Sequence, residues 1–336
     1  MAKNVINKSY SPAEIARARH LNLVIKDIKG TTEQIEKRDK VLHTIWLVLV
    51  YAFLVFMSVV VLIPFYWMII TSLKSVSEIR NEITYFPKQI VWENYVVLFK
   101  GAEVGTFFEN TQVISPFDFW VYLRNTLIVG VLSTAGTIFT TILAAFAFSR
   151  LQFKGRDLMF TILLATMMIP GEMMVITNYI TVANLGWIKD SGGAVGVFAS
   201  MIVPFWISVF YIYLLRQNFK QIPNELYLAA KVDGKSDWSY LWKVMVPLAK
   251  PTLITIFILK LMGAWNSYVW PNLVADKEQY RLISNGLRSS FSTVTGEPQY
   301  GLQMAATVLV TVPLLLLFIF FRKYIMRGVG RAGIKG

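Results

Sequence analysis

Residues able to support enzymatic or metal chemistry are scarce in this sequence. It has no cysteine and only two histidines, His20 and His43. That composition excludes thiolate zinc sites, iron–sulfur clusters, thiol nucleophiles and a histidine-rich metal site. A membrane-bound enzyme would need His, Asp or Cys clustered at one membrane face, and the sequence has no such cluster. We therefore predict that the chain is not an enzyme and binds no metal.

One short motif imitates a nucleotide-binding loop. Gly234-Lys235-Ser236 copies the end of the phosphate-binding loop of many ATPases. A working loop needs another glycine five residues before Gly234, at a transition from strand to helix. That position is Ala229, inside a predicted helix. We predict that this chain binds no ATP or other cofactor of its own.

Two charged residues interrupt otherwise apolar runs, Glu172 and Lys260. A charge at the centre of a membrane costs at least about 2.5–3.5 kcal/mol, so each should face a polar path or a partner helix. Trp265, Asn266 and Tyr268 follow Lys260 on the same predicted helix. Offsets of five and eight residues are expected to place Trp265 and Tyr268 within about a third of a turn of its face. Lys260 could instead reach the membrane surface or pair with Glu172, and Glu172, after Pro170-Gly171, favours a structural role at a helix break.

The elements that carry these residues are six long apolar runs. Of the 336 residues, 55% are apolar and 16% are charged, too few charges for a soluble protein of this size. The runs cover residues 44–70, 127–148, 158–182, 194–215, 252–274 and 304–321. Each is long enough to cross about 30 Å of hydrocarbon as a helix, and none alternates as a membrane β-strand would. Pro64, Pro170, Pro204 and Pro313 should bend four of them. The predicted fold class is an all-α membrane protein with six transmembrane helices.

Charge distribution predicts the orientation. The net charge is +13, and residues 1–43, 149–157, 216–251 and 322–336 hold 23 Lys and Arg residues against 9 in the segments between them. Basic residues favour the cytoplasmic side, so both termini are expected there, in a multi-pass protein of the membrane. Because the basic residues flank apolar runs, they indicate membrane topology and not nucleic-acid binding.

The chain divides into three predicted parts. Residues 1–40 form a basic N-terminal arm, residues 41–326 the transmembrane domain, and residues 327–336 a cytoplasmic tail. The arm is too long and polar for a secretory signal. Ser11 followed by Pro12 predicts a helix start. The arm could lie on the inner membrane surface as an amphipathic helix or form a solvated, partly ordered segment.

A loop at residues 222–250 has the pattern of a helix, a turn and a second helix. Pro223-Asn224 can start the first helix, Gly234 allows a positive φ in the turn, and Ser236 or Asp237 can start a second helix closed by Pro247. Such a projection suits insertion into a groove on another protein.

This loop resembles the EAA loop of ABC importer permeases, and the surrounding chain is similar to the maltose-type carbohydrate permeases, particularly their smaller subunit. The resemblance rests on the lead-in Ile222-Pro223-Asn224-Glu225-Leu226, on Ala229-Ala230, Asp233-Gly234 and Pro247-Leu248, and on segments outside the loop. Those segments are 64–67, 72–74, 124–127, 144–150, 168–172, 215–219, 265–266 and 334–336. It covers roughly residues 41–336 and implies the architecture of a type I ABC importer permease.

The resemblance also implies a function, partners and site residues. It implies a permease subunit of an ATP-driven importer for oligosaccharides or related polyols in the bacterial inner membrane. Expected partners are a second homologous permease, two ATP-binding subunits that carry ATP and Mg, and an extracytoplasmic carbohydrate-binding protein. The implied ATPase-coupling residues are Glu225, Leu228, Ala229, Ala230, Asp233, Gly234 and Pro247, and the implied tail contact is Ile334, Lys335 and Gly336. Lys260, Trp265, Asn266, Tyr268 and Glu172 are candidates for the translocation path, where they could hydrogen-bond and stack a sugar.

One residue departs from the family pattern, and one other class of function stays open. Leu228 stands where the family has the glutamate that is expected to contact a basic residue of the ATPase. Docking is then expected to rest more on Ala229, Ala230, Gly234 and apolar contact. The alternative function is a secondary transporter or channel subunit not driven by ATP, which predicts inverted repeats and several paired intramembrane charges. Neither feature is evident in the sequence.

Overall fold

The computed structural model describes residues 11–103, 114–188, 192–291 and 299–330, and regular structure in these ranges is helical. An isolated antiparallel bridge between Ala102 and Ile114 is the β pairing found there. The chain forms two compact units, Met1–Trp67 and Met68–Gly336, which are described separately. Tail residues Ile334, Lys335 and Gly336 lie outside the described ranges.

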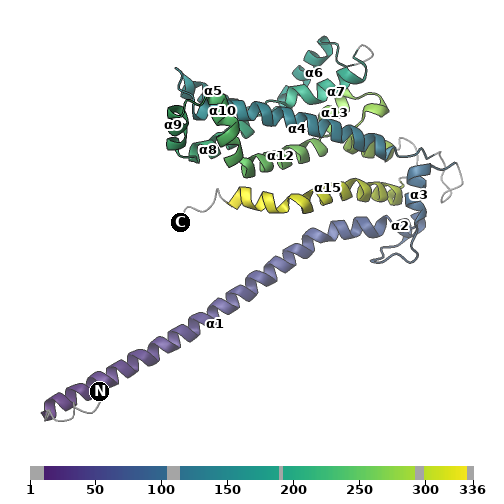
Figure 1. Cartoon of the computed structure of the whole chain (residues 1–336). Helices are drawn as coiled ribbons and strands as arrows, with labels where there is room; N and C mark the ends of the chain where they lie inside the picture. Colours follow the sequence, from purple (N-terminus) through teal and green to yellow (C-terminus); the bar gives the residue numbers. More distant parts are fainter. Residues whose placement is uncertain (1–10, 104–113, 189–191, 292–298, 331–336) are drawn as a thin grey trace. The chain divides into compact units, whose positions relative to one another are not determined.

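The first unit consists of helix α1, which begins at Pro12 as the sequence predicts and continues through this unit to end at Thr71 (Figure 1). The sequence analysis separates an arm over residues 1–40 from a span that starts near residue 44, but the helix has no break there. Residues 31–43 contain Glu, Gln, Lys and Arg, which are good helix formers, and neither Gly nor Pro. Large apolar side chains such as Trp46, Phe53 and Leu62 are exposed, as expected for a helix that faces lipid.

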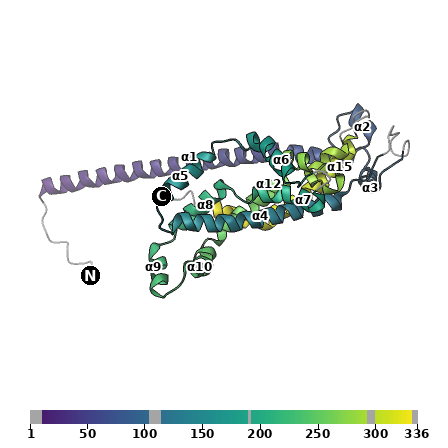
Figure 2. The ribbon, with the colours of Figure 1, turned by 90° about the horizontal axis from the view of Figure 1, so that it is seen from above.

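The second unit contains the remaining helices. In chain order they are α2 (Val76–Asn81), α3 (Glu93–Lys100), α4 (Phe119–Ser149), α5 (Arg156–Thr166), η1 (Gly171–Met174), α6 (Val175–Asn184), α7 (Gly193–Ile202), η2 (Val203–Phe205), α8 (Val209–Gln221), α9 (Asn224–Val232), α10 (Asp237–Tyr240), η3 (Leu241–Met245), α11 (Val246–Leu248), α12 (Lys250–Trp265), α13 (Val269–Val274), η4 (Glu278–Tyr280), α14 (Ile283–Phe291) and α15 (Tyr300–Gly330). Figures 1 and 2 both place α9 and α10 at the end of this unit opposite α2 and α3.

The six apolar runs fold in two ways. Within the described residues, Arg38–Thr71, α4 and Tyr300–Arg322 of α15 are continuous helices long and apolar enough to cross a membrane. Three helix pairs reach that length only together, because each is bent: by 86° between α5 and η1–α6, by 46° between α7–η2 and α8, and by 77° between α10–α11 and α12. The third pair begins inside the loop at residues 222–250, whereas the run expected over residues 252–274 is interrupted after Trp265 and resumes as α13. The six runs are therefore not six unbroken helices.

Proline position explains part of this difference. Pro170 is the N-cap of η1 and Pro204 lies within η2, so both mark bends, whereas Pro64 and Pro313 lie inside continuous helices. Proline removes one backbone donor and tightens or bends the helix, but neighbouring contacts decide whether the helix continues.

Helix α4 organises the packing of the second unit. It packs against α8 and α12, and α15 packs on the other side of α12 (Figure 1). Along its length α4 contributes Tyr122 to one buried apolar cluster, Val129 to a second, and Ile142 and Phe146 to a third. At Gly136 a Cβ atom would lie 2.2 Å from the Trp206 indole, so only glycine allows α4 to approach the bend before α8 this closely.

Candidate functional site

The loop between α8 and α12 contains a well-defined turn. Helix α9 ends at Val232, and Gly234 follows with a φ of +71°. The Lys235 N–H donates to the Ala230 carbonyl at 2.9 Å and the Gly234 N–H to the Lys231 carbonyl at 3.0 Å, the pattern of a Schellman motif. Ser236 then caps α10 by accepting a hydrogen bond from the Ser239 N–H at 3.2 Å. The positive φ at Gly234 and the helix start at Ser236 are as the sequence predicts.

Side chains also link the two helices across this turn. Asp237 of α10 accepts a hydrogen bond from the Tyr227 hydroxyl at 2.8 Å and pairs with the Lys231 ammonium at 2.7 Å. The bond to Asp237 raises the pKa of Lys231, and burial, followed by that same carboxylate, raises the pKa of Tyr227. Tyr227 also packs edge-on against Tyr240, with ring centroids 5.1 Å apart. Helices α9 and α10 are thus held to each other as one body.

Two buried arginines fasten the start of this loop to the helices behind it. Arg150, at the end of α4, donates to the Phe219 carbonyl at 2.8 Å and to the Ile222 carbonyl, where α8 ends. Arg216 of α8 donates in return to the Phe148 carbonyl of α4 at 3.0 Å and lies 3.8 Å from the Phe160 ring centroid. Each arginine therefore satisfies carbonyls at the C-terminal end of the other's helix, where the partial charge is negative.

Sequence reasoning missed this reciprocal pair. It counted Arg150 and Arg216 as evidence of topology, because basic residues at the ends of apolar runs usually indicate orientation. The position of each arginine could have indicated this role. Each lies close to the end of a long apolar segment, where its side chain can turn back and donate to carbonyl groups at a helix C-terminus.

The loop exposes several large apolar side chains among charged ones. Leu226, Leu228, Val232 and Trp238 are all exposed. Among the other coupling residues expected from the resemblance, Glu225, Ala229, Asp233, Gly234 and Pro247 are exposed and Ala230 is half-buried. Soluble regions rarely leave large apolar side chains together on a short helical projection, so this surface fits contact with another protein.

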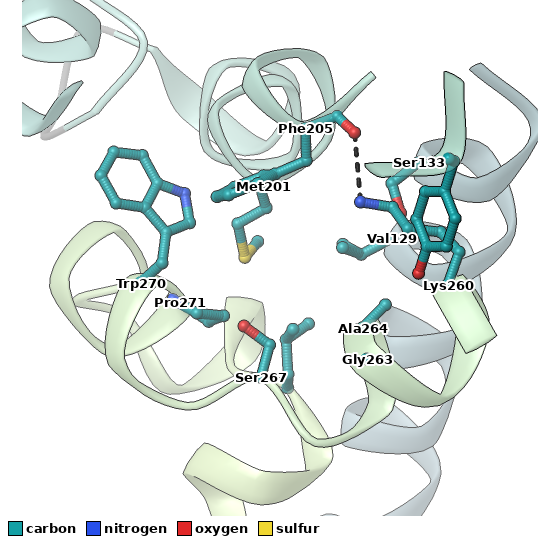
Figure 3. A pocket seen from close by; sticks show the side chains of 12 residues that line it. Val129, Ser133, Met201, Phe205, Lys260, Gly263, Ala264, Ser267, Trp270 and Pro271 are labelled. Atoms are coloured by element: carbon teal, nitrogen blue, oxygen red, sulfur yellow. Dashed lines mark hydrogen bonds between the residues drawn. The ribbon is translucent and has the colours of Figure 1, made fainter. Parts of the chain in front are cut away.

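A cavity of about 270 Å³ lies between helices of the second unit (Figure 3). Helices α4, α7, η2, α8, α12 and α13, with the segments on either side of α13, supply its lining: Val129, Ser133, Met201, Phe205, Tyr211, Lys260, Gly263, Ala264, Ser267, Trp270, Pro271 and Leu282. The Lys260 ammonium donates to the Phe205 carbonyl at 3.1 Å, and in Figure 3 it lies across the cavity from the Trp270 indole. Lys260 thus contacts the carbonyl that ends the broken helix α7–η2.

The other candidates for the translocation path do not line this cavity. Trp265 is buried with Leu98, Phe117 and Tyr122 in a separate apolar cluster. Asn266 is exposed and donates back to the Met262 carbonyl at 3.0 Å, and Tyr268 lies 5.1 Å below the Arg288 guanidinium. Trp265 is expected within about a third of a turn of the Lys260 face, and the roughly 140° that five residues turn the helix takes it into this cluster and away from the cavity. For Tyr268 the helical spacing fails because α12 ends at Trp265.

Among the described residues, Glu172 does not interact with Lys260. It is an exposed residue of η1, directly after the break at Pro170. Lys260 and Glu172 form no ion pair within the described part of the chain, and Glu172 does not line the cavity. Trp270 and Ser267 line the cavity, whereas Trp265 and Tyr268 do not.

These features define a class of protein. A helical membrane protein with bent helix pairs, a cavity between its helices and a loop that exposes large apolar side chains has the architecture of a transport permease. The family model described as "Binding-protein-dependent transport system inner membrane component" matches residues 136–331, more than half of the chain. The chain belongs to this family, and it is an ABC permease subunit.

Individual relatives agree with that assignment. The arabinooligosaccharides transport system permease protein AraQ of Bacillus subtilis is 26% identical, over 84% of this chain and 94% of its own length. The trehalose/maltose transport system permease protein MalG of Thermococcus litoralis is 28% identical, over 89% of this chain and 99% of its own. The crystal structure of a bacterial ABC transporter involved in alginate import contains a chain with the same fold, with a TM-score of 0.69 at 21% identity over 83% of this chain and 96% of that one.

Proposed function

We propose that the chain is the membrane-spanning permease subunit of an ATP-driven importer for oligosaccharides or related polyols. The single observation that carries the proposal is the loop at residues 222–250, in which two short helices are joined by side-chain contacts and expose large apolar residues. Arg150 holds the start of this loop to the end of α4. The carbohydrate class is supported by the relatives, which are named as permeases for arabinooligosaccharides and for trehalose and maltose.

The proposed complex contains a second, similar permease, two ATP-binding subunits with ATP and Mg, and an extracytoplasmic carbohydrate-binding protein. The family description supports the binding-protein partner. Both termini would lie in the cytoplasm of a bacterial cell, with the loop at residues 222–250 on the same side, as the basic segments indicate.

The mechanism follows from how the loop is connected. Helix α8 leads from the loop to the Phe205 side of the cavity, and α12 leads from the loop to Lys260. When the ATP-binding subunits close, they would push the loop as a rigid lever and shift both walls together. Alternating access would result from this motion, and the chain itself would make or break no covalent bond.

The test is uptake by the complete transporter in proteoliposomes. Permease pair, ATP-binding subunits and binding protein are reconstituted, and a panel of oligosaccharides and polyols is tested for stimulation of ATPase activity and for accumulation. We expect at least one carbohydrate to do both, and accumulation to stop when the ATP-binding site of the partner subunit is inactivated. Accumulation driven by an ion gradient without ATP would instead support the secondary transporter.

A further inference from the structure

The cavity around Lys260 carries one unbalanced positive charge. Of the described residues that line it, Lys260 alone has a formal charge, and no Asp or Glu is among them. The ammonium has three N–H donors, and the structure gives it one hydrogen-bond acceptor, the Phe205 carbonyl. The ammonium borders a space whose other lining side chains are neutral (Figure 3).

Its electrostatic setting favours a negatively charged ligand. A lysine inside a membrane domain usually pairs with a carboxylate or with backbone carbonyls. Lys260 forms no ion pair with Glu172 within the described residues, and the Phe205 carbonyl supplies only a partial negative charge. A neutral sugar could accept hydrogen bonds from the ammonium but would leave its charge without compensation. An acidic group would compensate it through charge-assisted hydrogen bonds.

The rest of the lining suits a sugar ring. Trp270 uses its indole N–H to donate to the Ser200 carbonyl at 3.0 Å, so the tryptophan adds an aromatic wall rather than a free donor. Ser133, Ser267 and Tyr211 add hydroxyl groups to the lining. At about 270 Å³ the cavity is at the small end of the range for ligand sites, so it fits one sugar unit and not a long chain.

We propose that this cavity is a subsite for the acidic group of an anionic carbohydrate, such as a uronic acid or a sugar phosphate, with Lys260 as the residue that selects it. The inference rests on the proposed function, because it specifies the substrate class of a carbohydrate permease. Carboxylate and phosphate share the chemistry that the ammonium recognises, and the experiment separates them.

The test measures direct binding, without the binding protein that would otherwise select the substrate first. The purified complex of both permeases and both ATP-binding subunits is titrated with galactose, galacturonate or galactose 6-phosphate at constant ionic strength, and the thermal midpoint is recorded. We expect at least one of the two acidic sugars to reach half-saturation at a concentration at least tenfold below that of galactose. The acidic sugar that does so identifies carboxylate or phosphate.

Three variants assign this preference to the cavity. Lys260→Gln keeps a hydrogen-bond donor but removes the charge, and should reduce the acidic preference to within twofold of galactose. Lys260→Arg keeps the charge and should retain it. Lys100→Gln, the control, changes an exposed lysine at the end of α3 and should behave as the parent protein.

Three outcomes would overturn the proposal. The first is that galactose and the acidic sugars bind with equal affinity. The second is that Lys260→Gln weakens the binding of all three sugars by the same factor. The third is that none of the three sugars stabilises a correctly assembled complex. Failure of the proposed function has a different signature, because then no carbohydrate drives ATP-dependent accumulation in the complete system. A transporter that accumulates neutral sugars without an acidic preference would refute this inference alone.

Discussion

Substitution of Gly234 by valine tests whether the loop transmits force. Gly234 has a φ of +71°, and a Cβ added there would meet nothing within 4 Å. The cost is therefore conformational and not steric. Left-handed backbone costs an ordinary residue about 1–2 kcal/mol, and a β-branched side chain is at the upper end or beyond.

A penalty of about 2 kcal/mol lowers the population of the native turn roughly 30-fold relative to other loop conformations. The hydrogen bonds from Gly234 and Lys235 that close α9 would weaken with it. The spans do not depend on this turn, so we expect Gly234→Val to insert and assemble but to hydrolyse ATP with little accumulation of sugar. Gly234→Ala, with a penalty of about 1 kcal/mol, should lie between the two.

The chain offers a matched control in Gly155. It has a φ of +81° and open space around it, and it precedes α5 rather than joining α9 to α10. Gly155→Val therefore imposes the same kind of backbone strain outside the loop at residues 222–250. The assay is sugar accumulated per ATP hydrolysed in proteoliposomes. If Gly234→Val accumulates as much sugar per ATP as the parent protein, or if both variants lose coupling equally, the loop does not act as a rigid lever.

Further predictions concern the helix clamp, the docking surface and the supposed ion pair. Arg150→Met leaves the carbonyls of Phe219 and Ile222 without their side-chain donor, so we expect the complex to lose about 2–4 kcal/mol of stability, measured by thermal denaturation. An unchanged midpoint would show that Arg150 does not stabilise the contact between α4 and α8. Leu228→Glu, at an exposed position, should leave folding intact but reduce co-purification of the ATP-binding subunits at least tenfold, whereas retained or stronger assembly would indicate a basic groove. Glu172→Gln and Lys260→Met should have additive effects on stability within about 0.5 kcal/mol, and a coupling of 1 kcal/mol or more would establish a pair between them.

The sequence predicted the loop closely because its signals are local. Pro223 before α9, glycine at the left-handed position and Ser236 as the N-cap each act through the backbone within a few residues. The apolar runs are evident from composition alone, but their helical limits are not, since the run at residues 252–274 is interrupted after Trp265. Their breaks were harder, since Pro170 and Pro313 have the same intrinsic effect, and only the surrounding packing separates a bend from a continuous helix.

The cavity could be predicted only in part. Lys260 is conspicuous in an apolar run, but its partner, the Phe205 carbonyl, lies 55 residues away and has no side-chain signature. Trp265 and Trp270 look equivalent in sequence, and the end of α12 between them decides that one enters the core and the other lines the cavity. Such distinctions depend on where a helix stops, which spacing alone predicts poorly.

The loop and the cavity are coupled by the way the chain passes through both. Residues 222–250 end directly at α12, and Lys260 lies ten residues into that helix, about 15 Å from its start. On the other side, α8 begins four residues after Phe205 and ends at the carbonyls held by Arg150. The hydrogen bond from Lys260 to Phe205 therefore joins α12 to η2, the short helix that precedes α8. A rigid displacement of the loop must either carry this bond with it or break it, and breaking it frees the ammonium to bind another acceptor. In the proposed transport cycle, the ammonium that links α12 to η2 is thus the same group that can bind an acidic substrate.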